Sequence, residues 1–276
     1  MLPKDGSGEI FVLDVGHSSQ LRKMIAADFP QVRTLSATDL TYDEAKSQVI
    51  KEAHGKYILF LDGDCLPQPN WHNHFLSALR KNPSQAYAGF TVYEGEWLAK
   101  MMTVMDFGFL LPRKRRVLPC YASNDCAFSK ETLEKFPLPK VCIRNGCFYH
   151  AQVLARANIP FQLVPEASVL HQLPPIIRER SRQGFDTIGA CWVDPKLPEA
   201  KWLKLGIFSI PLFYALNIFN DWRRTWAGHK DLELRFWQTL LSFPLFLFFR
   251  LIDVCGMFVA FTRGRREEAW GGFSIN

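Results

Sequence analysis

The sequence lacks any Cys-x-x-Cys pair, and its seven cysteines are an odd number spread between residues 65 and 255. Structural zinc sites and disulfide frameworks normally show paired cysteines, so both are disfavoured. The start of the chain also lacks a basic segment followed by an apolar core, which speaks against a secretory signal peptide. These absences predict a protein with reduced thiols that faces the cytosol.

A large excess of one charge sign is also missing, because 33 Lys and Arg accompany 27 Asp and Glu, for a net charge of +6. The basic residues gather in three clusters, at residues 113–116, 178–182 and 263–266. The last third of the chain is rich in Phe and Trp, and its stretches 205–219 and 236–249 are long and apolar. Basic clusters beside apolar stretches favour a membrane surface over nucleic acid as the partner.

The most informative stretch is the apolar run at residues 57–61, which is typical of a strand with both faces covered. Asp62 and Asp64 follow it directly, separated by one glycine. Ligands of open α/β sheets bind where strands end, and two carboxylates there can present oxygens to a divalent cation that also holds phosphates. The alternative is an Asp-Gly turn without a ligand, because Asp and Gly are ordinary turn residues.

The first part of the chain alternates between strand and helix patterns. The expected elements are strand 9–14, helix 19–29, strand 32–35, helix 43–54 and strand 57–61. Gly55 is expected to terminate the second helix. This order predicts a doubly wound α/β fold with a parallel sheet, in which Asp14 and Asp62 lie at the same edge.

Five blocks occur in a characteristic order and spacing. They are residues 9–14, 45–48, 55–67, 122–131 and 159–171. Together they resemble the family 2 glycosyltransferases, whose nucleotide-binding sheet is called the GT-A fold. The resemblance implies a GT-A-like (Rossmann-like) α/β domain at residues 1–190, followed by membrane-associated helices at residues 191–276.

The resemblance also implies roles for single residues in binding a nucleotide-diphosphate sugar. Asp14 would face the nucleotide base, with Lys46 near it. Asp62 would face the ribose, and Asp64 would bind a divalent cation, Mg²⁺ or Mn²⁺. His171 matches a histidine that helps to hold the cation or the diphosphate in many relatives; the alternative is a histidine that merely caps a strand end. The chemistry is consistent, because carboxylates accept from base N–H groups and a cation neutralises phosphate charge.

Two features depart from the family pattern. The family opens with an apolar strand, whereas this chain opens with Met-Leu-Pro-Lys-Asp-Gly-Ser-Gly at residues 1–8, so that strand is expected to be missing. Where the family has a Glu-Asp base, residues 144–147 read Arg-Asn-Gly-Cys, without a carboxylate. A thiol with an ordinary pKa of about 8.5 is a poor base at neutral pH. Cys147 and Asp125 are therefore the two candidates for the base, and Asp125 has the alternative of a loop aspartate that bonds its own backbone.

Four residues are expected on the acceptor side. Asn124 lies in the block that looks like the acceptor-side segment of the family. Arg180, Arg182 and Gln183 lie in a segment that resembles the Gln/Arg-rich interfacial segment of membrane-bound members.

Neither apolar stretch is a clear membrane span. Stretch 205–219 contains Pro211 and is shorter than the about 20 residues that a span needs. Stretch 236–249 extends to residue 261 only past Arg250 and Asp253, which are three residues apart and could pair on one helix face. Core helices of a soluble domain are the alternative. Tryptophans fall near the ends of both stretches, as interfacial anchors do; they are Trp192, Trp202, Trp222, Trp226 and Trp237.

The combined prediction is a glycosyltransferase that moves a sugar from a nucleotide-diphosphate sugar to a lipid-linked saccharide or polysaccharide at the cytoplasmic face of a membrane. The resemblance implies inversion at the anomeric carbon, and other glycan-biosynthesis proteins are expected partners. The alternative is a catalytically inactive relative that binds a nucleotide sugar or acts as a scaffold. The missing carboxylate favours the inactive relative, whereas Asp62, Asp64 and His171 favour the enzyme.

Overall fold

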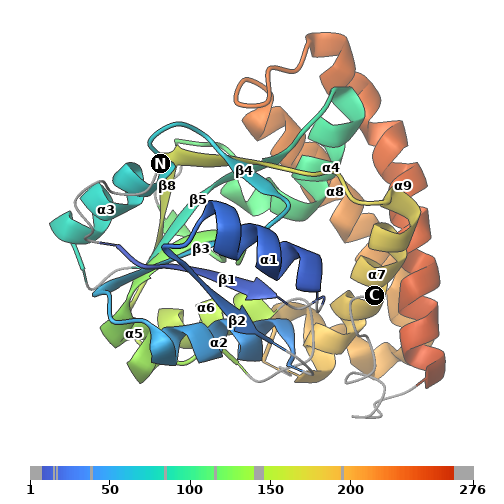
Figure 1. Cartoon of the computed structure of the whole chain (residues 1–276). Helices are drawn as coiled ribbons and strands as arrows, with labels where there is room; N and C mark the ends of the chain where they lie inside the picture. The colour runs from blue at the N-terminus through green and yellow to red at the C-terminus, as the bar shows by residue number, and fades with distance from the viewer. Residues whose placement is uncertain are drawn as a thin grey trace.

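The computed structural model describes residues 8–14, 16, 18–37, 40–83, 86–114, 117–139, 146–193 and 196–263. They form an α/β body with long helices gathered at one side (Figure 1). The strands are β1 (Ile10–Asp14), β2 (Val32–Ser36), β3 (Tyr57–Leu61), β4 (Cys65–Pro67), β5 (Ala86–Tyr93), β6 (Val117–Leu118), β7 (Asp125–Ser129) and β8 (Phe161–His171). The helices are α1 (Ser19–Asp28), α2 (Tyr42–Glu52), α3 (Trp71–Lys81), α4 (Trp97–Phe107), η1 (Gly108–Leu110), α5 (Lys130–Lys135), α6 (Gly146–Arg156), α7 (Ile176–Val193), η2 (Pro198–Ser209), α8 (Ile210–Gly228) and α9 (Phe236–Arg263).

The strands form two sheets. β1 and β2 pair in parallel. The other sheet has six strands in the order β3-β7-β5-β8-β4, with β6 paired to β8. Because β3 pairs antiparallel with β7, the prediction of a single parallel sheet is wrong, although the α/β class is confirmed. The apolar run of β3 indicates that both faces of this strand are covered, and the structure confirms it. Such a run does not indicate whether the neighbouring strand is parallel or antiparallel.

The free edges of β1 and β3 border the same cavity, which is lined by residues 10–13 and 57–61. Within the described part of the chain, no strand pairs with either edge. One further strand between β1 and β3 would join the two sheets. The absence of the first strand of the family pattern stays a prediction.

Local sequence fixes the start of α2 beside this cavity. Thr41 and Glu44 form a capping box, in which the Glu44 carboxylate accepts from the Thr41 backbone N–H at 3.0 Å. The box satisfies amide groups that the first helical turn leaves unpaired. It thereby sets the direction of Tyr42, Asp43 and Lys46, which all line the cavity.

Helices cover both faces of the six-stranded sheet. On one face, Trp71 and Phe75 of α3 pack on Ala127 and Val169. On the other face, α4 and α6 pack together with Phe246 of α9, so the C-terminal helices belong to the main core.

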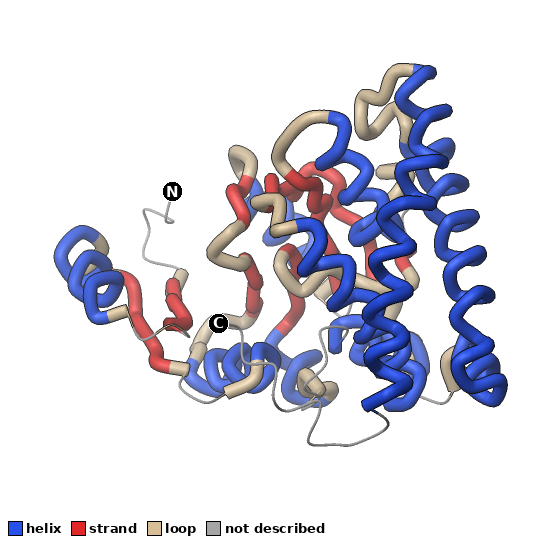
Figure 2. The backbone as a smooth tube through the Cα atoms, turned by 90° about the vertical axis from the view of Figure 1, so that its right-hand side faces the viewer, coloured by secondary structure: helices blue, strands red, loops and turns tan. Residues whose placement is uncertain are grey.

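The helices at the C-terminal end form one layer. In Figure 1, α9 runs over the height of the body and lies beside α7 in the lower part of the view, and Figure 2 shows long helices gathered on one side of the strands. Two helical segments, Glu199–Gly228 and Phe236–Arg263, are long and apolar enough to cross a membrane. The boundary expected between residues 190 and 191 falls inside α7, so the division into two parts stays a prediction.

Candidate active site

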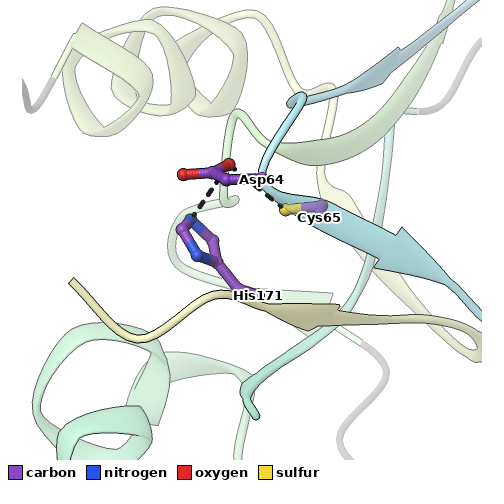
Figure 3. Close-up of side chains that lie close together, drawn as sticks. All are labelled: Asp64, Cys65 and His171. Atoms are coloured by element: carbon purple, nitrogen blue, oxygen red, sulfur yellow. Dashed lines mark hydrogen bonds and ion pairs between the residues drawn. The ribbon is translucent and has the colours of Figure 1, made fainter.

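The register of β4 and β8 brings Asp64 and His171 together. Cys65 and His171 are direct partners in this antiparallel pair, so Asp64 lies one residue before the pairing (Figure 3). The Asp64 Oδ1 and His171 Nε2 atoms are 3.7 Å apart. Asp64 is half exposed, whereas the His171 side chain is largely covered, and both line the cavity.

The hydrogen bonds of His171 suit a cation ligand. Its Nδ1–H donates to the carbonyl of Gln172 at 2.8 Å, which leaves the lone pair of Nε2 directed at Asp64. A histidine that ligates a metal typically has its other ring nitrogen fixed in this way. One carboxylate and one imidazole that face the same space fit a divalent cation with open positions for phosphate oxygens.

Cys65 completes a group of three potential ligands whose donor atoms lie within 4.8 Å of one another. Burial raises the pKa of the Cys65 thiol to about 12, although a hydrogen bond from Asn124 opposes the shift. Asn124 Nδ2 donates to the sulfur at 3.3 Å. The thiol therefore stays protonated at neutral pH, and Asp64 and His171 are the better ligands for a hard cation.

Asp62 and Lys46 form a second pair in the cavity. Lys46 Nζ lies 3.0 Å from Asp62 Oδ1 and donates to the carbonyl of Ser123 at 2.6 Å. The Tyr42 hydroxyl donates to the Asp62 carboxylate at 2.7 Å and also contacts Lys46. The structure therefore brings together two predicted residues, Lys46 and Asp62. It adds Tyr42, whose role could not be predicted, because a single aromatic residue at the start of a helix is not a functional signal.

These groups line one cavity of about 2740 Å³. Its volume exceeds the about 300 to 1,000 Å³ of typical small-ligand sites, so it has room for more than one small ligand. Asp62, Asp64 and His171 contribute to its wall, as do Cys147 and Arg180.

Asp14 does not line this cavity. Its carboxylate accepts from the backbone N–H of Gly16 at 3.1 Å and pairs with Arg22 at 3.2 Å, which fixes the turn between β1 and α1. The predicted contact of Asp14 with a nucleotide base therefore remains a proposal that rests on the family resemblance.

Asp125 is fully buried and also lies away from the cavity wall. The Trp71 indole donates to its Oδ1 at 2.8 Å, and Thr91 lies 3.5 Å from its Oδ2. Burial raises the pKa of Asp125 to about 8. This geometry supports a structural role, and the prediction of Asp125 as the base gains no support from it.

The raised pKa predicts how stability depends on pH. Between the ordinary value of 3.8 and about 8, the folded chain holds a proton on Asp125 that the unfolded chain has released. The free energy of unfolding should therefore fall as pH rises, by up to about 1.4 kcal/mol per unit from this group. Asp43 contributes in the same way only up to about pH 6. Between pH 6 and pH 8 the contribution of Asp125 is therefore the difference in slope between the unmodified chain and a variant that lacks this carboxylate.

Asp125→Asn should flatten the fall in stability between pH 6 and pH 8, because its amide oxygen still accepts from Trp71 without titrating. Urea unfolding at several pH values measures this, with Asp43→Asn as the matched variant that keeps the slope. An unchanged slope in Asp125→Asn would contradict the assignment.

Cys147, at the start of α6, is half-buried in the cavity wall. A hydrogen bond with the Cys120 thiol lowers the pKa of Cys147, while burial opposes the shift. Arg144 and Asn145 lie outside the described residues.

Asp43 is a carboxylate beside Cys147 that the sequence did not single out. A Cβ at Gly146 would collide with Asp43 Oδ2, so the carboxylate lies directly against the start of α6. Asp43 is 7% exposed and lines the cavity. Burial raises the pKa of Asp43 to about 6, with Lys46 opposing the shift and Asp62 adding to it. A contact between residues 43 and 146 leaves no signal in the sequence.

The residues predicted on the acceptor side differ in their exposure. Asn124 is buried, and its backbone carbonyl accepts from Asp62 N–H at 3.3 Å. Arg182 and Gln183 are half-buried in the cavity wall, and Gln183 Nε2 donates to Glu179 at 3.2 Å. Arg180 is fully buried and pairs with Asp106, so its head group is committed to the protein.

A chain of contacts links the candidate cation ligands to the helical layer. The ring of Tyr93 packs against that of His171 at 5.2 Å, and its hydroxyl donates to Asp106 at 3.0 Å. Asp106 pairs with Arg180, whose Nε lies 3.8 Å from Asp253 Oδ1 of α9. A continuous series of contacts thus runs from His171 to α7 and α9.

Solved structures share this architecture. The mannosyltransferase PcManGT from Pyrobaculum calidifontis, in complex with GDP-Man and Mn²⁺, matches with a TM-score of 0.59 and 13% identity, over 91% of this chain and 77% of that chain. GalNAc-T7 with UDP, GalNAc and Mn²⁺ matches with a TM-score of 0.48 and 14% identity, over 62% of this chain and 39% of that chain. The present chain thus spans well under half of the GalNAc-T7 chain. Among curated proteins, none matches the sequence.

The mixed sheet and the PcManGT likeness define a GT-A fold. The family described as Glycosyl transferase family 2 matches residues 8–147, just over half of the 276 residues, and the chain belongs to this family.

Proposed function

We propose that this glycosyltransferase moves a sugar from a nucleotide-diphosphate sugar to a membrane-proximal acceptor, a lipid-linked saccharide or a polysaccharide. Inversion at the anomeric carbon and a site on the cytoplasmic face of the membrane are parts of the proposal. The observation that carries it is the placement of Asp64 and His171 across the β4–β8 register, in one cavity with the Lys46–Asp62 pair. The complex of PcManGT with GDP-Man and Mn²⁺ supports the same kinds of ligand.

Each residue of the cavity has a task in this proposal. Asp64 and His171 would hold a divalent cation, Mg²⁺ or Mn²⁺, which neutralises the diphosphate as the sugar bond breaks. Asp62, held by Lys46 and Tyr42, would accept from the ribose hydroxyls. Arg182 and Gln183 would lie on the acceptor side.

We assign the acceptor proton to Asp43. In the transfer step the acceptor oxygen bonds to the anomeric carbon, the bond from that carbon to the diphosphate oxygen breaks, and the hydroxyl proton moves to the Asp43 carboxylate. Among the described carboxylates of the cavity wall, Asp43 is the one that touches the start of α6, where the family pattern places its base. Its pKa of about 6 keeps it ionised at neutral pH while leaving it basic enough to act.

Calorimetry with a panel of nucleotide sugars, each with and without Mn²⁺, tests donor binding. One donor should bind with micromolar to millimolar affinity only when the cation is present, because the diphosphate otherwise faces Asp62 and Asp64. Transfer and donor hydrolysis are then measured with that donor. The absence of cation-dependent binding across the panel would overturn the proposal.

An inactive nucleotide-sugar-binding or scaffold protein is the second candidate, favoured by the absence of a carboxylate at Gly146 and Cys147. It predicts donor binding without transfer, and some recovery of transfer in Cys147→Asp. Turnover by the unmodified chain would exclude it.

A further inference from the structure

The outer side of the helical layer is apolar and exposed. It is formed by η2, α8 and α9, and we call it the lipid face. Phe208 of η2 is 81% exposed, Phe236 of α9 is 72% exposed and Phe248 of α9 is 61% exposed. Soluble monomers rarely expose large apolar side chains along three consecutive helical segments, so this face calls for a partner.

The inner side of the same helices carries buried charges. Arg250 of α9 donates to Asp221 of α8 at 2.7 Å and to Asp253 at 2.6 Å, which confirms the expected pairing of Arg250 with Asp253. Asp253 also faces Arg180 of α7. α9 therefore directs its paired charges toward the domain, among apolar core residues such as Phe246 and Met257, and exposes an apolar side away from it.

α7 and α9 cannot separate without breaking their packing. A Cβ at Gly184 of α7 would collide with the carbonyl of Asp253, and one at Gly256 of α9 would collide with the carbonyl of Ser181. The two backbones touch at these positions, as small residues allow. α7 contains several charged residues, among them Arg178 and Arg182.

We infer that α8 and α9 dock flat on an anionic lipid bilayer, with the lipid face in the interfacial layer, and do not cross the membrane. A crossing α9 would take α7 and its charges into the hydrocarbon, where each charged side chain is strongly disfavoured. A helix that is held against a charged domain on its inner side and exposes an apolar outer side is suited to lie about 5 to 10 Å into the interface.

Exposed cations beside the lipid face favour an anionic lipid. Lys204 of η2 and Arg235, which directly precedes α9, are exposed next to Leu205 and Phe236. Cations beside a buried apolar side attract anionic headgroups. Trp237 is exposed on the same helix, as an interfacial anchor would be.

This inference rests on the membrane association proposed above, and its test needs neither nucleotide nor turnover. Lys51 lies exposed on α2, and Lys230 lies between α8 and α9. The double variant Lys51→Cys and Lys230→Cys is prepared in a Cys255→Ser background and reconstituted into sealed vesicles of phosphatidylglycerol and phosphatidylcholine. A membrane-impermeant maleimide is added from outside, and the labels on each intact chain are counted by mass spectrometry after subtraction of the background.

Flat docking places both new thiols on the same side, so each chain should carry two labels or none, whatever its orientation. If α8 and α9 crossed the bilayer as a hairpin, each chain would carry one label, and the inference would be wrong. Failure of the unmodified chain to float with the vesicles would also overturn it.

A second pair of variants tests the lipid face itself. Phe248→Asp removes a large apolar contact and adds a charge, so vesicle partitioning should fall by at least about tenfold. Met24→Asp is the matched control, because Met24 is 49% exposed on α1, away from the lipid face. Equal partitioning of the two variants would contradict the inference.

Discussion

Asp64→Ala should abolish the cation dependence of nucleotide binding and weaken binding by at least about 100-fold. The variant loses one of two candidate ligands, and changes in the groups that merely support ligands already cost about 10- to 100-fold in metal affinity. Without a bound cation, the diphosphate also faces the negative charge of Asp62. Calorimetric titrations of the donor at several Mn²⁺ concentrations measure both effects.

Glu94→Ala is the matched control for this experiment. Glu94 is an exposed acid whose backbone N–H donates to the carbonyl of His171 at 2.8 Å, yet its side chain does not line the cavity. The Glu94→Ala variant should bind the donor with the same affinity and the same cation dependence as the unmodified chain. If Asp64→Ala binds the donor with unchanged, cation-dependent affinity, Asp64 is not a ligand of the cation.

Asp43→Asn should lower turnover by about 10²- to 10⁴-fold while leaving donor affinity unchanged within about twofold. The amide cannot accept the acceptor proton, but it keeps the shape of the side chain against Gly146. In the unmodified chain, turnover should fall below about pH 6 as Asp43 becomes protonated, since only the ionised carboxylate is a base. The residual turnover of Asp43→Asn should lack this acidic limb.

Two comparison variants separate the candidates for the base. Asp125→Asn and Cys147→Ala test the two residues that the sequence indicated, and Glu131→Gln, an exposed acid on α5, is the control outside the cavity. A large loss of turnover in Asp125→Asn with normal turnover in Asp43→Asn would return the role to Asp125. Normal turnover in Asp125→Asn, Asp43→Asn and Cys147→Ala would mean that another group accepts the proton of the acceptor hydroxyl.

The sequence predicted features that depend on short stretches of chain. The strand at residues 57–61, the helix that begins near residue 43 and the Arg250–Asp253 pair follow from local patterns, and the structure has all three. The approach of Asp64 to His171 could be expected only because the family resemblance related two distant blocks.

Features that depend on tertiary contacts left no pattern in the sequence. The antiparallel partner of β3, which is β7, comes from a distant segment of the chain. Arg180 of α7 is buried because it pairs with Asp106 of α4 and faces Asp253 of α9. Asp43 stands among ordinary helix-start residues, and only the fold places it against Gly146. Burial therefore decided which acidic residues are available for chemistry.

The packing of α7 against α9 also has a consequence for the order in which the protein is made. Residues 97–193 leave the ribosome before α9, so Arg180 can pair with Asp253 only after α9 has emerged. Chains fold from the N-terminus as they emerge, so the contacts from His171 through Tyr93 and Asp106 to Arg180 can form before those with α9. The buried Arg180 thus meets its second carboxylate, and the lipid face gains α9, in the same late step.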